Sequence, residues 1–248
     1  MDTDRKQGED RDRRDPPGSE AAVSRYDRDD DLTAAARDGA PRVRVYRPDA
    51  VSVVLGRGSR PELELCEADC AADAVPIRRR PGGGCAVVLD PGNVIVVAAI
   101  PQSGLPRIRE LFASFTGWML RGLARVGLGD VRQADVSDLV ARDRKVGGAS
   151  IYRPQGAALY GVSLLVEPRL DLMERYLKHP PREPSYRRGR RHADFVGRLA
   201  DEPGGWTAER LAAALAEVLT PPSWEEPPMG AGEQAGRGDE EGTTDGHR

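Results

Sequence analysis

The stretch IRRRPGGGCAVVLDPGNVIVV (residues 77–97) places arginines and three consecutive glycines directly before two apolar runs. The runs CAVVL and NVIVVAAI are typical of strands, and Asp-Pro-Gly-Asn between them predicts a turn, because proline fixes φ while glycine and asparagine tolerate a positive φ. Guanidinium groups donate hydrogen bonds in a rigid fork, and glycines let backbone N–H groups approach an oxygen closely. The stretch therefore predicts a loop that holds an anionic ligand, with a plain turn as the open alternative.

A second stretch, DRKVGGASIYR (residues 143–153), carries a lysine in a chain that has almost none. Of the 37 lysine and arginine residues, only Lys6, Lys145 and Lys178 are lysines. A chain so rich in arginine is expected to use arginine wherever any cation suffices, and a compact ammonium differs from a planar guanidinium. Lys145, beside a Gly-Gly pair, is therefore a candidate functional residue, and a lysine retained by chance is the alternative.

Composition divides the 248 residues into one folded unit with two polar ends. Residues 1–39 and 221–248 are rich in charged residues, proline and glycine. They contain too few apolar groups to offset the entropy lost on ordering, so we expect a disordered charged N-terminal extension and a disordered polar C-terminal tail. Residues 40–220 hold the apolar runs and are numerous enough for a full hydrophobic core.

Charge and cysteine usage argue against several classes of protein. The net charge is −3 at pH 7 with both signs mixed, so we expect no nucleic acid partner, and the run YRRGRRH (186–192) reads as solvated or helix-capping charge. No apolar run reaches membrane-spanning length and no signal segment opens the chain, so we expect no membrane association and a cytoplasmic location. The three cysteines and three histidines lack metal-ligand spacing, which predicts no disulfide and no metal held by the protein.

Alternating short strands and helices indicate an α+β domain and argue against a parallel doubly wound sheet. The strand patterns lie at 43–46, 51–55, 138–142 and 158–166, the first two forming a plausible hairpin. The helix patterns lie at 61–74, 106–128, 170–177 and 208–219. Within the longest of them, apolar residues recur at three- and four-residue spacing, which predicts a stripe that faces the core.

Several motifs in order resemble a known family. They are YRPDAVSVVLGRG, RRPGGGCAVVLDPGN, SDLVARDRKVGGA, LYGVSLLV and EPSYRRGRRHADFVGRL, between Val43 and Leu199. Together they are similar to the catalytic domain of lipoate-protein ligases in the biotin/lipoate ligase superfamily. The resemblance implies the class II ligase-like fold, with mixed, mostly antiparallel sheets flanked by helices. It also implies that ATP, with Mg²⁺, activates lipoate or octanoate as an acyl-adenylate, and that the acyl group passes to a lysine of an acceptor protein.

The resemblance also implies roles for individual residues. Lys145 matches the essential lysine of the family. The positions that match the ATP and acyl-adenylate site are Arg79, Arg80, Gly83, Gly84, Cys85, Asp90, Asn93 and Asp138. The positions that match the acyl tunnel are Gly82, Gly148, Tyr160 and Gly161.

The sequence departs from the family pattern at several of these places. Leu89 stands where a histidine is frequent, Ser137 where an asparagine usually precedes the acidic residue, and Tyr160 where a histidine lies near the tunnel. Cys85 fills the small-residue position of the glycine loop. These departures bear on the acyl group and the nucleotide contacts, and they leave open a degenerate homologue that binds acyl groups without catalysis.

The implied acceptor is a lipoyl domain, of a 2-oxoacid dehydrogenase E2 subunit or a glycine cleavage H-like protein. Many relatives carry an accessory C-terminal domain, whereas this chain turns polar after Leu219. Two alternatives therefore stay open: a separate accessory subunit assists adenylation, or the chain uses a preformed acyl-adenylate. A related branch transfers octanoyl or lipoyl groups from a carrier protein through a cysteine thioester. No cysteine follows Lys145 in this sequence, which favours the ligase.

Overall fold

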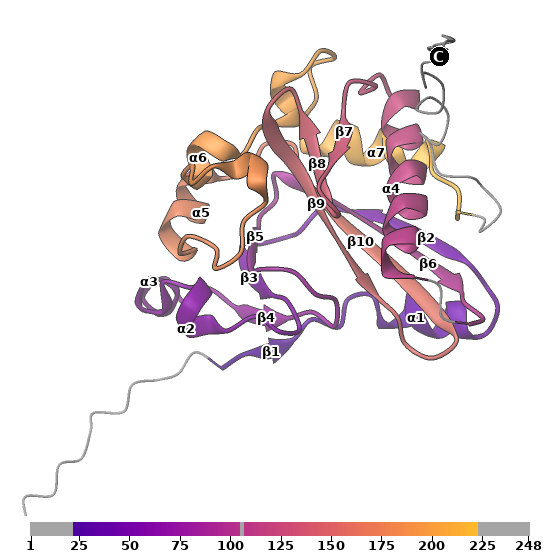
Figure 1. Cartoon of the computed structure of the whole chain (residues 1–248), viewed down its shortest axis with the longest axis horizontal. Coiled ribbons are helices and arrows are strands. Elements are labelled where there is room, and N and C mark those ends of the chain that lie inside the picture. The colour runs from indigo at the N-terminus through magenta and orange to yellow at the C-terminus, as the bar shows by residue number, and fades with distance from the viewer. Residues whose placement is uncertain (1–21, 105–106, 223–248) are drawn as a thin grey trace, which may run out of the picture.

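The computed structural model describes residues 22–104 and 107–222 as two β-sheets with helices packed around them (Figure 1). The larger sheet is antiparallel throughout, in the order β2 (Arg42–Tyr46), β6 (Asn93–Pro101), β10 (Ala157–Leu165), β9 (Arg144–Tyr152), β8 (Asp138–Ala141) and β7 (Arg132–Ala134). The smaller sheet is mixed, in the order β1 (Ser24–Arg25), β4 (Ile77–Arg79), β3 (Ser52–Leu55) and β5 (Val87–Leu89). The expected α+β class with mixed, mostly antiparallel sheets is confirmed.

Strand β6 is apolar along almost its whole length because both of its faces are buried. Side chains alternate between the two faces of a strand. Val94 and Val96 accordingly belong to one core cluster, whereas Ile95 and Val97 belong to another. The continuous apolar run in the sequence therefore marks a central strand that is covered on both sides.

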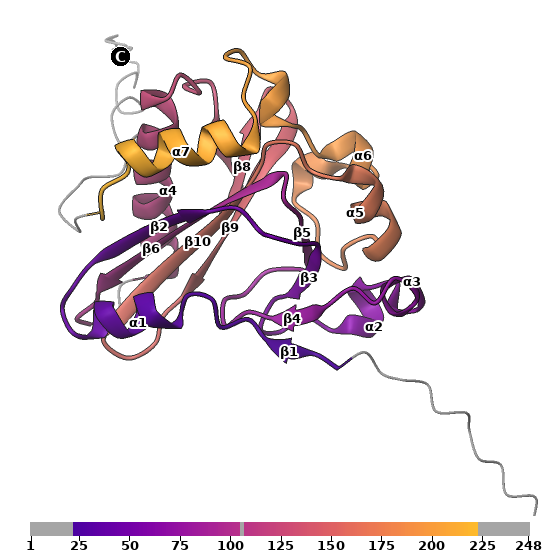
Figure 2. The same cartoon turned by 180° about the vertical axis from the view of Figure 1, so that it is seen from behind.

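The helices place different layers on the two faces of the larger sheet. Helices α4 (Ile108–Arg125) and α7 (Ala208–Val218) lie against one face, as Figures 1 and 2 show from opposite sides. Helix α1 (Asp30–Arg37) and the smaller sheet cover the other face. The remaining short elements are α2 (Pro61–Glu64), α3 (Glu67–Ala72), α5 (Leu170–Tyr176), η1 (Ser185–Arg187), α6 (His192–Phe195) and η2 (Leu199–Asp201).

The ordered domain begins before residue 40, which corrects the expected boundary. Residues 22–39 include β1 and α1, and Leu32 and Ala36 of α1 are buried in the core. Burial of a leucine side chain contributes about 1.5–3 kcal/mol, so a few apolar residues suffice where a sheet face receives them. The disorder expected for residues 1–21 and 223–248 concerns positions that lie outside the described residues.

The first two strands do not form the expected hairpin. Strand β2 pairs with β6 in the larger sheet, whereas β3 pairs with β4 and β5 in the smaller sheet. The predicted turn at residues 90–93 is present, since Asn93 N–H donates to the Asp90 carbonyl at 2.9 Å, but it carries the chain from β5 in one sheet to β6 in the other. Local patterns do not separate these two cases, because a tight turn serves both a hairpin and a passage between sheets.

The helix expected over residues 61–74 is interrupted. Helix α2 ends at Glu64 and α3 begins at Glu67, while the fully buried Leu65 between them forms a β-bridge with Leu177. Tertiary packing here outweighs helix propensity. The other expected segments are confirmed, with small differences at their ends, as β8, β10, α4, α5 and α7.

Candidate functional site

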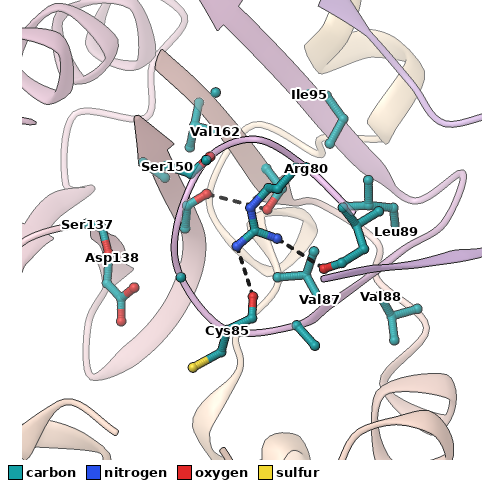
Figure 3. A pocket seen from close by; sticks show the side chains of 18 of the residues that line it. Arg80, Cys85, Val87, Val88, Leu89, Ile95, Ser137, Asp138, Ser150 and Val162 are labelled. Atoms are coloured by element: carbon teal, nitrogen blue, oxygen red, sulfur yellow. Dashed lines mark hydrogen bonds between the residues drawn. The ribbon is translucent and has the colours of Figure 1, made fainter. Parts of the chain in front are cut away.

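A cavity of about 430 Å³ lies between the smaller sheet and the larger one. Its size falls within the roughly 300–1,000 Å³ that small-molecule sites usually have. One part of its lining is apolar and includes Val87, Leu89, Ile95, Val97 and Leu159. Another part is polar or charged and includes Ser137, Asp138, Lys145, Arg187 and His192. Figure 3 shows Leu89 and Ile95 on one side of Arg80, with Ser137 and Asp138 on the opposite side.

Arg80 holds the curved loop that follows β4. Its Nε and Nη2 donate to the Gly83 carbonyl at 3.2 and 2.7 Å, Nη2 also donates to the Cys85 carbonyl at 2.9 Å, and Nη1 donates to the Val54 carbonyl at 3.0 Å. Figure 3 shows the guanidinium inside the curve of the loop. Burial lowers the pKa of Arg80 to about 10, which leaves the group charged at neutral pH. All three nitrogens of Arg80 are therefore engaged by backbone carbonyls, and its main effect is to shape the loop.

The glycines of this loop allow close packing that a side chain would prevent. A Cβ at Gly56, at the end of β3, would overlap the Gly84 carbonyl oxygen. Gly84 itself has φ +93°, a conformation that glycine adopts at little cost. A Cβ at Gly82 would come within 3.0 Å of the Ser150 hydroxyl on β9. The loop can therefore pack closely against β3 and β9 because these positions lack side chains.

The buried carboxylate of Glu64 fixes the C-terminal end of the loop. Glu64 is 6% exposed, and its Oε2 accepts from the Ala86 N–H at 2.6 Å and from the Ser59 hydroxyl at 3.0 Å. The Ser59 hydroxyl also lies 3.1 Å from the Gly84 carbonyl. Arg79 holds the segment that follows β3, because its Nη1 donates to the carbonyls of Gly56 and Ser59, each at 2.8 Å. The loop is thus held by contacts from β3 and α2 as well as by its own arginines.

Lys145 lies across Gly148 and pairs with Asp138. Its Nζ is 2.7 Å from Asp138 Oδ1, and the side chains of Lys145 and Asp138 are 28% and 9% exposed. A Cβ at Gly148 would approach the Lys145 Nζ to 3.2 Å, so the glycine leaves room for the lysine stem. A bulge between Leu139 and Val140 shifts the β8–β9 register, which sets Asp138 opposite Gly148. The ammonium therefore has a fixed position at the cavity wall.

Tyr186 links this ion pair to the segment before α6. Its hydroxyl donates to Asp138 Oδ2 at 2.7 Å, so both carboxylate oxygens of Asp138 are engaged. Burial, together with the Asp138 carboxylate, raises the pKa of Tyr186 well above its ordinary value, and the phenol stays protonated. Its ring packs against Phe195 with centroids 5.1 Å apart. The position of Lys145 is thus coupled to η1 and α6.

Polar groups from the N-terminal segment line another part of the cavity. The hydroxyls of Tyr26 and Tyr46 lie 2.8 Å apart, and Tyr46 also lies 3.5 Å from the Asp29 carboxylate. Burial raises the pKa of Asp29 to about 6, against the opposing effect of the Arg44 charge. This group joins α1 to β2 beside the apolar lining.

The structure brings most of the sequence-predicted residues to one cavity. Those that line it are Arg80, Gly82, Gly84, Cys85, Asp138, Lys145, Gly148 and Gly161. The predicted residues outside the lining are Arg79, Gly83, Asp90, Asn93 and Tyr160.

Asp90 and Asn93 fix the turn between the two sheets. Asn93 Oδ1 accepts from the Asp90 N–H at 2.8 Å, and Asp90 Oδ1 accepts from the Gly92 N–H at 2.7 Å. Asp90 Oδ2 accepts from the Arg169 N–H at 3.1 Å. Both residues are buried, at 1% and 0% exposure, and these hydrogen bonds shape the turn.

Tyr160 faces the opposite side of the larger sheet from the cavity. It is fully buried and stacks on Phe115 of α4, with ring centroids 5.2 Å apart. Its neighbours Leu159 and Gly161 line the cavity instead, as the alternation of side chains along β10 requires. The tunnel role implied for Tyr160 therefore does not fit its position.

Sequence reasoning missed several residues that build the site. The sequence around Gly56 and Glu64 carries no signal that either residue packs against the glycine loop. Tyr186, Arg187 and His192 lay in a run that suggested solvated charge, yet Arg187 is buried and lines the cavity with His192. Their sequence patterns match many surface segments, so burial by distant elements was needed to identify them.

Two further observations concern the residues that the structure describes. Among residues 22–104 and 107–222, no three His, Cys, Asp or Glu side chains gather in a way that could hold a metal ion. Within the same ranges, every helix is too short or too polar to cross a bilayer.

Known proteins are similar to this chain in sequence and in fold. The family profile described as the lipoyl protein ligase A/B catalytic domain matches residues 25–220. Lipoate–protein ligase 2 of Staphylococcus aureus (strain Mu50) is 28% identical over 126 residues, which are 51% of this chain and 36% of that protein. The match thus spans only about a third of the length of that curated relative.

Two solved structures have the same fold. A bi-partite lipoate protein ligase from Thermoplasma acidophilum, described with its E2 lipoyl domain, superposes with a TM-score of 0.61 and 21% identity over 79% of each chain. A lipoate-protein ligase A bound with ATP superposes with a TM-score of 0.62 and 23% identity over 75% of each chain. At these identities the likeness concerns the fold.

Proposed function

Because the chain belongs to the lipoyl protein ligase A/B catalytic domain family, we propose that it is an ATP-dependent lipoate–protein ligase. In the first step, a carboxylate oxygen of lipoate or octanoate attacks the α-phosphorus of ATP, and pyrophosphate leaves. In the second step, the amine of an acceptor lysine attacks the acyl carbonyl carbon, AMP leaves, and an amide forms. Mg²⁺ is expected to enter with the ATP phosphates.

The observation that carries this proposal is the fixed ammonium of Lys145 beside an apolar pocket. The ammonium is held 2.7 Å from Asp138, and the same cavity is lined by Val87, Ile95 and Val97. A hydrocarbon chain with a carboxylate end needs both environments in one cavity. Activation at the carboxylate end and burial of the chain therefore suit this site.

The charged groups would stabilise the transition states of both steps. Adenylation spreads negative charge over phosphate oxygens, and aminolysis builds an oxyanion on the acyl carbonyl. A cation whose position is fixed by Asp138 and Gly148 does not need to reorganise as that charge develops, so it stabilises the transition state more than the ground state. In this proposal Lys145 carries that role, and Arg80 keeps the adjacent loop in shape.

The proposed acceptor is a lipoyl domain, and the proposed acyl group is lipoate or octanoate. The Thermoplasma ligase is described as bi-partite and with an E2 lipoyl domain. On that precedent, we propose that a separate accessory subunit assists adenylation by this chain.

The cysteine-dependent transferase is the second candidate, and Cys85 is the one cysteine that lines the cavity among the described residues. Burial and the Glu64 carboxylate raise the pKa of its thiol, which reduces the thiolate available for attack at neutral pH. Its sulfur lies 3.9 Å from the Arg182 carbonyl, a contact that supplies no general base. These features favour the ligase.

One assay tests the proposal and its alternatives. The purified chain is incubated with ATP, Mg²⁺, lipoate or octanoate and an apo lipoyl domain, and the intact mass of the acceptor is measured with pyrophosphate release. An acyl mass increase that requires ATP supports the ligase. Transfer of the acyl group from an acylated carrier protein without ATP would show that the chain is a transferase and not a ligase. Binding of the acyl group without pyrophosphate release or transfer would indicate a degenerate homologue. Repeating the assay with a candidate accessory subunit tests the need for a partner.

A further inference from the structure

Arg187 is an arginine of the basic run 186–192 whose side chain points inward. The side chain is 5% exposed, and its guanidinium carbon lies 4.8 Å from the centre of the Phe195 ring. The Nε donates to the Arg190 carbonyl at 3.0 Å, and the Glu183 carboxylate lies 3.6 Å away. One side of the guanidinium is therefore fixed by its own segment.

The other side of the guanidinium lacks a partner. Arg187 Nη2 is buried and forms no hydrogen bond with any of the described residues, and Arg187 lines the same cavity as Lys145. A buried donor without an acceptor is costly, and the cost is larger when the group is charged. A buried guanidinium on a residue that lines the cavity is suited to an anionic ligand.

Each of the two cations at this position has an acidic neighbour. The Glu183 carboxylate lies 3.6 Å from Arg187, and the Glu174 carboxylate, which pairs with Arg191 at 3.4 Å, also acts on Arg187. Both oxygens of Asp138 are engaged by Lys145 and Tyr186. His192 adds no negative charge and stays neutral. Burial, reinforced by the positive charge of Arg187, lowers its pKa to about 4. Two fixed cations therefore share this part of the cavity.

The two cations are also held as one unit. Tyr186, the residue before Arg187, donates to Asp138, and Asp138 pairs with Lys145, each at 2.7 Å. A displacement of η1 would therefore disturb both the arginine and the lysine. Two positive groups with a fixed relation suit an anion that offers several oxygens, and a phosphate offers more of them than a carboxylate.

We propose that Arg187 binds a phosphate oxygen of the adenylate through its guanidinium and shares this phosphate with Lys145. The proposal rests on the proposed ligase function and adds a second phosphate-binding residue to its site. It also divides the basic run into two parts, because Arg188 and Arg191 are exposed whereas Arg187 is buried. The exposed arginines are the ones available to an acidic protein surface.

Binding of AMP and adenosine by the full chain tests this assignment without turnover. The two probes differ only in the phosphate, and their affinities are measured by isothermal titration calorimetry. Arg187→Met should weaken AMP binding by about 10- to 100-fold, the range for a lost hydrogen bond between charged groups, and leave adenosine binding unchanged. Arg188→Asn is the matched control, because it removes an exposed charge at a positive φ that asparagine tolerates, and it should keep the preference for AMP.

A second variant acts in the opposite direction and does not depend on the folding of Arg187→Met. Glu183→Gln removes the carboxylate that competes for Arg187, so it should tighten AMP binding by about 2- to 5-fold and leave adenosine unchanged. An unchanged preference for AMP in Arg187→Met, or an unchanged AMP affinity in Glu183→Gln, overturns the phosphate-binding role of Arg187. Neither result bears on the proposed ligase function. Failure of the unmodified chain to bind either probe would instead overturn the proposed ligase function.

Discussion

The loop after β4 contributes Arg80 to the cavity, whereas the segment 178–192 contributes Arg182 and Arg187. Arg80 and Arg187 are used differently. Arg80 donates from all three nitrogens to backbone carbonyls. Arg187 is buried, whereas Arg80 is half-buried, and Arg187 Nη2 has no partner among the described residues. An arginine in a ligand site thus shapes the protein when its donors are all satisfied by protein acceptors. It is available to the ligand when one donor lacks such an acceptor.

Lys145 lies between these two cases, since it has one carboxylate partner and remains 28% exposed. Asp138 fixes the ammonium without enclosing it. The lysine is thus held in place and still open to the cavity. The four predictions below test this division between groups that shape the site and groups that act in it.

The largest effect is expected from Lys145→Arg. The guanidinium keeps the charge but moves its donors, so acceptor lipoylation should fall by about 100- to 1,000-fold, as for other lost donors that stabilise a transition state. The thermal midpoint should change little, because the residue is partly exposed. Lys178→Arg is the matched control, since Lys178 is exposed and its Nζ donates to the Glu62 carbonyl away from the cavity. Near-normal turnover by Lys145→Arg would remove Lys145 from the mechanism.

Arg80→Met should differ by lowering stability as well as activity. Loss of the guanidinium leaves the carbonyls of Gly83, Cys85 and Val54 without these donors, which should reduce the free energy of unfolding by about 1–3 kcal/mol. Urea denaturation measures the change, and Arg57→Met at an exposed position of the neighbouring loop is the control. If Arg80→Met lost lipoylation while its unfolding free energy stayed unchanged, Arg80 would belong with the groups that act on the ligand.

Tyr186→Phe should have a smaller effect. It removes the hydrogen bond to Asp138 and keeps the ring against Phe195, so we expect lipoylation to fall by about 3- to 10-fold. Tyr176→Phe loses a comparable bond, to Asp73 at 2.8 Å, outside the cavity lining. Equal activity of the two variants would indicate that the link from η1 to the ion pair has no effect on the reaction.

The smallest effect is expected in the pH dependence of stability. Burial raises the pKa of Asp29 from 3.8 to about 6, so the folded state binds an extra proton in that window and the unfolding free energy falls as pH rises through it. Burial lowers the pKa of His192 from 6.5 to about 4, so the unfolded state binds the extra proton and the unfolding free energy falls as pH drops. In the unmodified chain these two slopes oppose each other between about pH 4 and 6.

Two variants separate the slopes. Asp29→Asn should make the unfolding free energy fall more steeply below about pH 6, and His192→Gln should make it fall less steeply. Urea denaturation from about pH 4 to pH 7 measures both. Identical slopes in the unmodified chain and the two variants would show that neither group titrates with a shifted pKa.

The sequence predicted the site better where its contacts are local. Arg80 bonds to residues three and five positions away, and Lys145 lies near Asp138 on adjacent strands, so short motifs contain these groups. The role implied for Tyr160 failed because a shift of one position along β10 changes the face of the sheet. The helix α1 was missed because its few apolar residues gain their stability from β6, which lies far along the chain.

The amino-acid sequence by itself determined the more regular strands and helices, such as β6, β10 and α4, together with the glycine loop and the motifs of the family, because these depend on periodicity and on residues close together in the chain. Only the tertiary structure decided which strands share a sheet and which charges are buried. Pairing and burial depend on partners distant in sequence, and a basic run looks the same whether its arginines face solvent or a cavity. Arg187 is an example, since its own segment fixes one side of the guanidinium, whereas the cavity formed with distant strands makes it an internal cation.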